Sequence, residues 1–246
     1  MQRISDELKA KNAIVTGASR GIGRAIALAL AARGASVAVG YVANRARAED
    51  VVAEIVAGGG TAVAIGADLA RPSEVARLFD EAEHALGPLD IVFVNAADAL
   101  VKPLVECTED DFDRMFSINA KGAFFTLQQA ATRLRDGGRI VATSTGGTQM
   151  LFSETSLYLG TKGAVEQFVR ALARELGDRH ITVNALSPGF TDTDLLPDRD
   201  REVAAAASPF GRVGQPEDVA DVAVFLAGDG ARWITGQNIG AGGGVF

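Results

Sequence analysis

Short apolar runs alternate with helical patterns along most of the chain. The apolar runs are continuous, as in Ile-Val-Phe-Val at 91–94, which is typical of strands covered by helices on both faces. The pattern predicts strands near residues 12–16, 36–41, 62–67, 91–95, 139–144, 182–187 and 237–240. It predicts helices near residues 21–33, 45–57, 73–86, 109–133, 157–176 and 216–226.

Two helix starts carry recognisable signals. Thr108 can cap the helix that begins at Glu109, and Pro72 opens another. Regular alternation of strand and helix predicts a parallel, doubly wound sheet. Because no linker, repeat or low-complexity tract divides the 246 residues, we expect a single Rossmann-like α/β domain over residues 1–246, with about seven parallel strands flanked by helices.

Unusual residues cluster where the predicted strands end. In an open parallel sheet, ligands bind at the carboxyl ends of the strands. These ends carry residues 17–23, Asp68, Asn95, the pair Ser144 and Thr145, and residues 188–193. We therefore expect the chemistry to lie along this edge.

A glycine-rich turn follows the first predicted strand. Gly17, Gly21 and Gly23 let the backbone turn tightly and approach a pyrophosphate, whose charge the following helix N-terminus favours. Since the turn joins an apolar strand to an Ala/Leu-rich helix, it indicates a nucleotide-binding site.

Tyr158 and Lys162 stand four residues apart on a predicted helix, so their side chains share one face. A lysine ammonium beside a phenol favours the phenolate and lowers its pKa from about 10, which makes tyrosine a usable proton donor near neutral pH. Together with the glycine-rich turn, the pair predicts nicotinamide-dependent carbonyl chemistry.

The second predicted strand bears on the cofactor. An NAD site usually has an acidic residue at the end of this strand, but the first acid here is Glu49, which comes too late. Arg20 in the turn and Arg45 after the strand suit the 2′-phosphate of NADPH through charge-assisted hydrogen bonds. We expect NADPH (NADP⁺) in preference to NAD(H).

Composition excludes several other classes. The net charge of −7 argues against a nucleic-acid partner. The single cysteine, Cys107, rules out an internal disulfide, and neither His84 nor His180 has a metal-ligand companion, so no metal is expected. Without an apolar core near the N-terminus or a long apolar run, we expect a cytoplasmic protein with no membrane partner.

These motifs, in this order, resemble the short-chain dehydrogenase/reductase family, and most closely its 3-oxoacyl-carrier-protein reductase type. Residues 187–193 look like the family's segment around the nicotinamide, and residues 210–218 and 234–237 resemble its C-terminal signatures. The resemblance covers essentially the whole chain. It implies a short-chain NADP(H)-dependent oxidoreductase acting on CH–OH or C=O groups.

The resemblance also implies residue roles. Tyr158 and Lys162 match the family's catalytic pair, and Asn119 matches the asparagine that supports a water and proton path from the lysine. The implied cofactor-binding residues are Gly17, Ser19, Arg20, Gly21, Ile22, Gly23, Tyr41, Asn44, Arg45, Asp68, Leu69, Asn95, Ala96, Ala97, Tyr158, Lys162, Pro188, Gly189, Thr191 and Thr193.

The chain departs from the family pattern at three places. Thr145 stands at the usual position of the catalytic serine, with Ser144 just before it; either hydroxyl could bind a carbonyl oxygen, and we prefer Thr145 because it keeps the spacing. Ala97 replaces a glycine of the cofactor-lining loop, and residues 240–243 lack the family's aspartate.

The expected reaction is reversible hydride transfer between NADPH and a small-molecule ketone or aldehyde, with a 3-oxoacyl thioester or a general carbonyl compound as substrate. The expected substrate residues are Met150, Leu151, Phe152 and Leu195, the last in a short lid segment at 194–210. Two alternatives stay open, an NADPH-binding regulatory protein with weak or lost activity and an NAD-dependent alcohol dehydrogenase. From the resemblance we also expect a homotetramer or a homodimer.

Overall fold

The computed structural model of the chain describes residues 6–246; the first five residues, part of the N-terminal segment that lacks an apolar core, lie outside this range. Seven parallel strands form one sheet in the order β3-β2-β1-β4-β5-β6-β7. Their bounds are β1 Asn12–Val15, β2 Ser36–Tyr41, β3 Thr61–Gly66, β4 Ile91–Val94, β5 Arg139–Thr143, β6 Thr182–Pro188 and β7 Asn238–Ala241. The predicted Rossmann-like fold is confirmed, with each strand within about two residues of its expected place.

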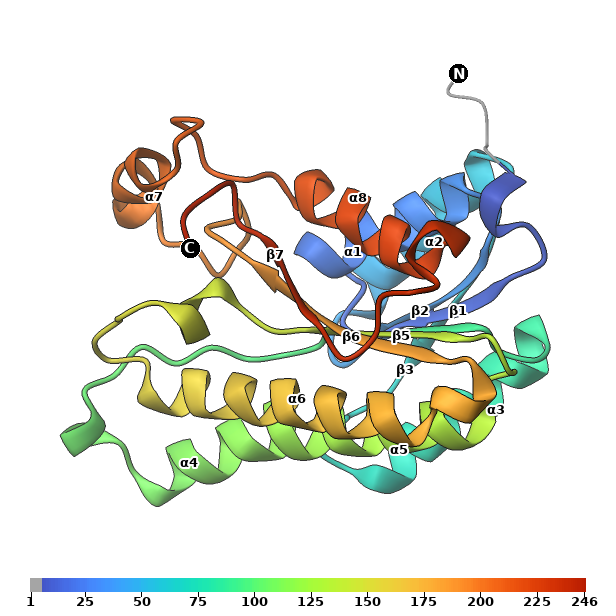
Figure 1. Ribbon diagram of the computed structural model, residues 1–246, viewed down its shortest axis with the longest axis horizontal. Coiled ribbons are helices and arrows are strands. Elements are labelled where there is room, and N and C mark those ends of the chain that lie inside the picture. The colour runs from blue at the N-terminus through green and yellow to red at the C-terminus, as the bar shows by residue number, and fades with distance from the viewer. Residues whose placement is uncertain (1–5) are drawn as a thin grey trace.

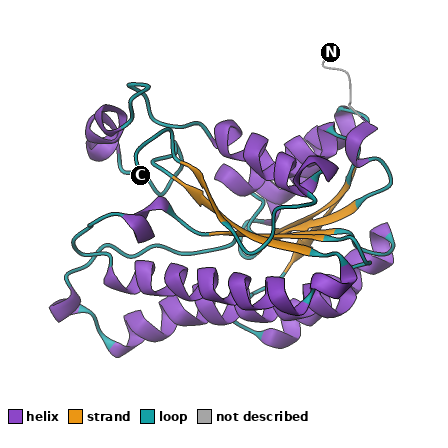
Figure 2. Ribbon diagram, in the orientation of Figure 1, coloured by secondary structure: helices purple, strands orange, loops and turns teal. Residues whose placement is uncertain are grey.

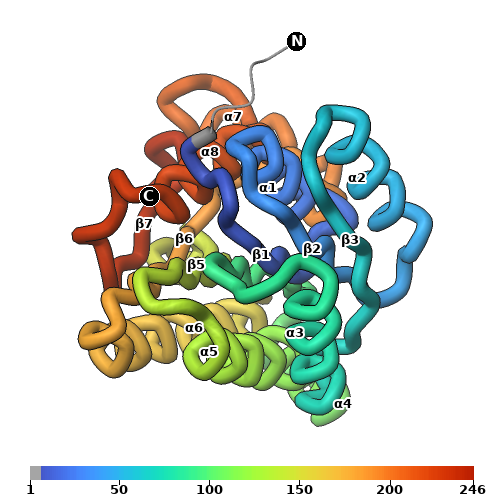
Figure 3. The backbone as a smooth tube through the Cα atoms, turned by 90° about the vertical axis from the view of Figure 1, so that its right-hand side faces the viewer, coloured from blue at the N-terminus to red at the C-terminus, as the bar shows by residue number. Residues whose placement is uncertain are grey.

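Helices cover both faces of this sheet (Figures 1 and 3). Their bounds are α1 Gly21–Ala32, α2 Arg45–Ala57, α3 Pro72–Leu86, α4 Glu109–Met115, α5 Gly122–Arg133, α6 Ser156–Glu175, α7 Arg201–Ala207 and α8 Pro216–Ala227. Helices α1, α2 and α8 pack on one face, while α3, α5 and α6 pack on the other. The short α7 stands apart at one end, among the loops of the carboxyl edge (Figure 2).

The continuous apolar strands supply both cores at once. In β1, Ala13 and Val15 face the α1/α8 side, while Ile14 between them faces the α3/α5/α6 side, because successive strand residues point to opposite faces. All three side chains are fully buried. A sheet covered in this way leaves its carboxyl edge as the place where polar side chains can meet a ligand.

The helix expected at 109–133 is confirmed in its extent, but its middle is π-helical and not α-helical. The helix α4 starts as expected, with the Thr108 hydroxyl accepting a hydrogen bond from the Asp111 amide at 3.2 Å. It ends at Met115, and a π-helical segment, Phe116–Lys121, leads into α5. The wider turn re-aims Asn119, whose contacts are described below.

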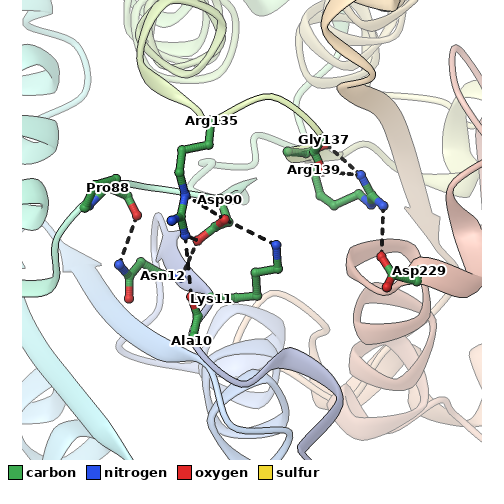
Figure 4. Close-up of polar contacts among 10 residues, drawn as sticks. Ala10, Lys11, Asn12, Pro88, Asp90, Arg135, Gly137, Arg139 and Asp229 are labelled. Carbon is green, nitrogen blue, oxygen red and sulfur yellow. Dashed lines mark hydrogen bonds and ion pairs between the residues drawn. The ribbon is translucent and has the colours of Figure 1, made fainter.

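A polar network ties the opposite, amino edge of the sheet together (Figure 4). The Asp90 carboxylate is 4% exposed and accepts hydrogen bonds from the Asn12 amide at 2.9 Å and from Arg135 at 2.5 Å, with Lys11 at 3.4 Å. These contacts join β1, the residue before β4 and the turn after α5. They stabilise the scaffold at a distance from the candidate site.

Candidate active site

Tyr158 and Lys162 lie on one face of α6, at the carboxyl end of β5. The Lys162 side chain is buried, and its Nζ donates to the Thr143 carbonyl oxygen at 2.8 Å. The same Nζ lies 5.8 Å from the centroid of the Tyr158 ring. The helical spacing thus brings the two groups together as expected.

Their ionisation differs from the expectation. Burial lowers the pKa of Lys162 to about 8. Burial raises the pKa of Tyr158, and a hydrogen bond from the Thr145 hydroxyl only partly opposes it. The expected lowering of the tyrosine pKa by the lysine is therefore wrong, since burial of the phenol outweighs the Thr145 hydrogen bond and the Lys162 ammonium donates to the Thr143 carbonyl. Tyr158 is held as a neutral phenol, the form that can donate a proton.

The structure separates the two candidate hydroxyls. Thr145 has extended backbone, its Oγ1 accepts from the Gly147 amide at 3.2 Å, and its proton is available for the Tyr158 oxygen. The Ser144 hydroxyl instead donates to the Glu166 carboxylate at 2.6 Å. The hydroxyl that meets the tyrosine is that of Thr145.

Asn119 is fully buried and fully partnered. Its Oδ1 accepts from the Asp98 amide at 2.8 Å, and its Nδ2 donates to the Asp98 carbonyl at 2.8 Å and to the Thr161 hydroxyl at 3.1 Å. Thr161 in turn donates to the Tyr158 carbonyl at 2.7 Å. Asn119 is thereby joined to the turn of α6 that carries Tyr158, and its part in a water path stays a prediction.

The glycine-rich turn has the shape that a pyrophosphate needs. Gly17 and Gly21 have φ angles of +64° and +54°, which residues with a side chain rarely adopt. A Cβ at Gly23 would lie 2.3 Å from the Gly17 carbonyl oxygen, and one at Gly17 would lie 2.8 Å from the Ala96 Cα. The turn is therefore closed to side chains but open to a ligand above the start of α1, so it fits a dinucleotide phosphate.

Two arginines converge beside this turn, and one of them is unexpected. Arg20 donates to Asp194 at 2.8 Å, and Arg47 lies 3.5 Å from the same carboxylate oxygen. Hydrogen bonding to Arg20, with Arg47 adding charge attraction, holds the pKa of the Asp194 carboxyl below its usual range. Arg45, the expected partner, is instead directed along α2 to Glu49 at 2.7 Å.

The expected residues around β2, β3 and β4 lie on the carboxyl edge. Tyr41 packs beside Gly66, and the Asn44 side chain caps α2 by accepting from the Arg47 amide at 3.0 Å. The remaining positions share this edge or the turn itself: Asp68 and the buried Leu69 after β3, Asn95, Ala96 and Ala97 after β4, and Ser19 and Ile22 at the start of α1.

The loop after β6 closes over the turn. A Cβ at Gly21 would lie 3.3 Å from the Thr193 methyl, and the Thr191 hydroxyl donates to the Gly189 carbonyl at 3.1 Å. Gly189, next to Pro188, packs so closely that a Cβ would lie 2.7 Å from the Gly242 Cα. The loop thus reaches the site from the side opposite to α6.

Two aromatic rings lie near the loop that carries Thr145. A Cβ added at Gly147 would lie 3.6 Å from the Phe152 ring, and this ring forms an edge-to-face pair with Phe190 at 6.0 Å between centroids. Among the other expected substrate residues, Leu151 and Leu195 are exposed and Met150 is half-buried.

Four residues of the site were not singled out from the sequence: Arg47, Glu166, Phe190 and Asp194. Glu166 carried a usable signal, because it lies four residues after Lys162 and eight after Tyr158, on the same helix face. Arg47 and Asp194 gave none, since their pairing is set by two loops that meet only in the fold.

Two absences concern only the described part of the chain, residues 6–246. No helix there is long and apolar enough to cross a membrane. No cluster of three or more His, Cys, Asp or Glu side chains there could hold a metal ion.

Comparison with known proteins places the chain among reductases. A family model described as enoyl-(acyl carrier protein) reductase matches residues 17–246. A versicolorin reductase from Emericella nidulans is 44% identical over 255 aligned positions, covering 97% of each protein. A hydroxynaphthalene reductase-like protein from Metarhizium brunneum is 44% identical over 250 positions, covering 94% of this chain and 93% of its own.

Solved structures agree with the sequence comparisons. An angucycline C-6 ketoreductase with bound NADP superposes with a TM-score of 0.94 at 40% identity, covering 100% of this chain and 99% of its own. A short-chain dehydrogenase from Burkholderia cenocepacia in complex with NADP also has a TM-score of 0.94, at 39% identity, covering 97% of this chain and 99% of its own. The chain belongs to the short-chain dehydrogenase/reductase family.

Proposed function

We propose that the protein is an NADPH-dependent ketone reductase in which Tyr158 donates the proton to the carbonyl oxygen. The observation that carries this proposal is the meeting of the Tyr158 phenol, the Thr145 hydroxyl and the Lys162 ammonium, which hydrogen bonds through Thr143 and Asn95 join to the glycine-rich turn. When bound, the reduced nicotinamide supplies the hydride to the carbonyl carbon. The reverse oxidation uses the same protein groups. The proposed enzyme is one domain spanning residues 1–246.

The three side chains divide the proton work. Thr145 Oγ1 accepts from the Gly147 amide, which leaves its own proton free to be donated to the Tyr158 oxygen and to support the phenolate as it forms. Tyr158, whose pKa burial raises, gives its proton to the substrate oxygen. Lys162 supplies positive charge nearby, and its pKa of about 8 leaves it mostly protonated at neutral pH. Asn119 braces the helix turn that carries the tyrosine.

The cofactor would lie on the glycine-rich turn, with its 2′-phosphate near Arg20 and Arg47. Both guanidinium groups already converge on one carboxylate oxygen, which marks a place suited to an anion. Arg45 stays a candidate for binding the 2′-phosphate, but its side chain is paired with Glu49. The related angucycline ketoreductase was solved with NADP, which supports NADPH over NAD(H) for this chain as well.

The proposed substrate is a ketone on a fused aromatic ring system. Phe152 and Phe190 form an edge-to-face pair near Gly147, two residues after Thr145, and aromatic faces pack well on such rings. The relatives' names point the same way, since they refer to versicolorin, a hydroxynaphthalene and an angucycline. A 3-oxoacyl thioester is the second candidate, because the matching family model is described for acyl-carrier-protein chemistry.

A substrate panel tests this function. NADPH and NADH consumption would be followed with a fused aromatic ketone, its saturated bicyclic counterpart, a β-ketoester and a 3-oxoacyl thioester, with Tyr158→Phe as the control. We expect NADPH-dependent turnover that is fastest on the aromatic ketone and lost in the control. Preference for the thioester would replace the substrate class. NADPH binding without turnover on any compound would support the regulatory alternative, and NADH preference would support the NAD-dependent dehydrogenase.

We further propose a homotetramer. Two apolar regions are exposed on different sides of the described chain: Phe124 on α5, which packs edge-to-face on Phe168 of α6, and the 95% exposed Trp233 with Phe225 of α8. Exposed apolar areas of this kind usually mark interfaces. Light scattering after gel filtration would test it, since a monomer or a dimer would refute the tetramer.

A cytoplasmic location stays our expectation, to be checked by cell fractionation.

A further inference from the structure

Glu166 receives two hydroxyls from the loop that carries Thr145. It lies on α6, one turn beyond Lys162 and two turns beyond Tyr158. Its Oε1 accepts from Ser144 Oγ at 2.6 Å and from Thr148 Oγ1 at 2.7 Å. These two residues flank Thr145, so one carboxylate grips the loop on both sides of it.

The loop is also held from within. The Thr148 hydroxyl lies 3.0 Å from the Thr145 carbonyl oxygen, and the Gly147 amide donates to Thr145 Oγ1 at 3.2 Å. The Thr148 hydroxyl has one proton, so it donates either to the Thr145 carbonyl or to Glu166 at a given moment; with the Gly147 bond, either choice holds the short turn in this conformation. The orientation of the Thr145 hydroxyl therefore depends on where Glu166 holds the loop against α6.

The same contacts keep Ser144 away from Tyr158. Eight residues of α-helix separate Glu166 from Tyr158, which is roughly 12 Å along the axis, and both side chains lean toward the N-terminus, so this separation is kept. A serine hydroxyl held 2.6 Å from the carboxylate is not available to the tyrosine. Hydrogen bonds to a carboxylate are among the strong ones. Turning the Ser144 hydroxyl toward Tyr158 would break this bond and cost free energy.

We propose that Glu166 is a positioning residue that clamps the loop of residues 144–148 to α6, and that this clamp selects Thr145 over Ser144 as the hydroxyl facing Tyr158. The inference rests on the proposed reductase function for its kinetic consequence. Its structural content, the placement of the Thr145 hydroxyl on Tyr158, can be measured without turnover.

A kinetic cycle tests the selection. Thr145→Val is expected to lower kcat/KM by about 100-fold in the wild-type background, the range for losing one hydrogen-bond donor to a reacting oxygen. Glu166→Ala is expected to lower kcat about tenfold with the KM for NADPH unchanged. In the Glu166→Ala background the Ser144 hydroxyl is released, so Thr145→Val should cost at least tenfold less than in the wild type. Adding Ser144→Ala to that double variant should restore the full loss.

Conservative and matched variants complete the cycle. Glu166→Gln keeps an acceptor oxygen and should recover most of the activity, while Gln167→Ala, at the exposed neighbouring position, should change nothing. If the Thr145→Val and Glu166→Ala losses simply multiply, the carboxylate has only a structural role and the proposal is overturned. A loss in Ser144→Ala alone as large as that in Tyr158→Phe would overturn the assignment of the hydroxyl.

An optical titration gives a readout that is independent of activity. The chain has two tyrosines, so in a Tyr41→Phe background the phenolate absorbance reports Tyr158 alone. The Thr145 hydrogen bond favours the phenolate. Glu166→Ala and Thr145→Val should therefore each raise the pH midpoint of Tyr158 ionisation, and Gln167→Ala should not. An unmoved midpoint in Glu166→Ala would overturn the clamp. A moved midpoint in a protein with no turnover on any ketone would refute the reductase function while leaving the clamp standing.

Discussion

Removing Arg47, beside the glycine-rich turn, should change the preference between NADPH and NADH. Arg47 shares the Asp194 carboxylate with Arg20, whereas Arg45 is engaged by Glu49. We predict that Arg47→Ala weakens the use of NADPH and leaves that of NADH unchanged, because only NADPH carries the 2′-phosphate. Arg45→Ala is the matched control two residues earlier on the same helix.

The magnitude follows from the exposure of the two side chains. A hydrogen bond to a charged group contributes about 1.5–3 kcal/mol. The Arg47 side chain is 54% exposed, so solvent screening reduces this to about 1–2 kcal/mol, or roughly 5- to 30-fold in the KM for NADPH. The Arg45 side chain is 76% exposed and already paired, so its removal should cost less than about threefold.

Steady-state kinetics with both cofactors, at one fixed ketone concentration, measure the effect as a ratio of KM values. Salt provides a further check, since added salt should shrink the Arg47 effect. The reasoning is refuted if Arg45→Ala loses as much as Arg47→Ala, or if the loss appears equally with NADH.

Three further predictions concern pH, stability and packing. Burial lowers the pKa of Lys162 from 10.5 to about 8, so the folded state binds fewer protons than the unfolded state between these pH values. The free energy of unfolding of the wild type should therefore rise by about 3 kcal/mol from pH 8 to pH 10.5, relative to that of Lys162→Met. If urea unfolding shows the same pH dependence of this free energy for both proteins, the prediction is contradicted. Asp90→Ala should destabilise the protein by about 2–4 kcal/mol in urea unfolding, because it removes a buried carboxylate held by Arg135; kcat of the folded enzyme should stay unchanged, since the network lies at the opposite edge. Gly146→Ala places a Cβ 2.0 Å from the Phe246 ring, beside Thr145, and should lower kcat at least about tenfold; a second change, Phe246→Ala, should restore part of it, and no rescue would argue against this contact as the cause.

Much of the fold could be predicted because its signals are local. Continuous apolar runs mark buried parallel strands, and the Thr108 cap marks the start of α4. The π-helical segment at Phe116–Lys121 was missed because one widened turn barely alters the apolar periodicity of a long helix. The positions of these elements were therefore predicted, while the local change of helix type was not.

The candidate site could be predicted to the level of its backbone-defined parts. The glycine positions and the Tyr158–Lys162 spacing follow from local geometry, which a sequence displays directly. Which of two adjacent hydroxyls meets the tyrosine depends on Glu166, a residue from another element, and the tyrosine pKa depends on burial. The spacing of Glu166 places it on the same helix face as Tyr158, but it does not show which hydroxyl the carboxylate binds or how deeply the phenol is buried.

The role of Tyr158 as proton donor is tested by single-turnover reduction of a fused aromatic ketone, comparing NADPH-loaded wild type with Tyr158→Phe and measuring the affinity of both for NADPH. The account predicts that the substitution lowers the rate by about 1,000-fold, within the range for loss of a general acid, while the Kd for NADPH stays within about twofold. A Tyr158→Phe protein that binds NADPH normally and still reduces the ketone at the wild-type rate would contradict the account.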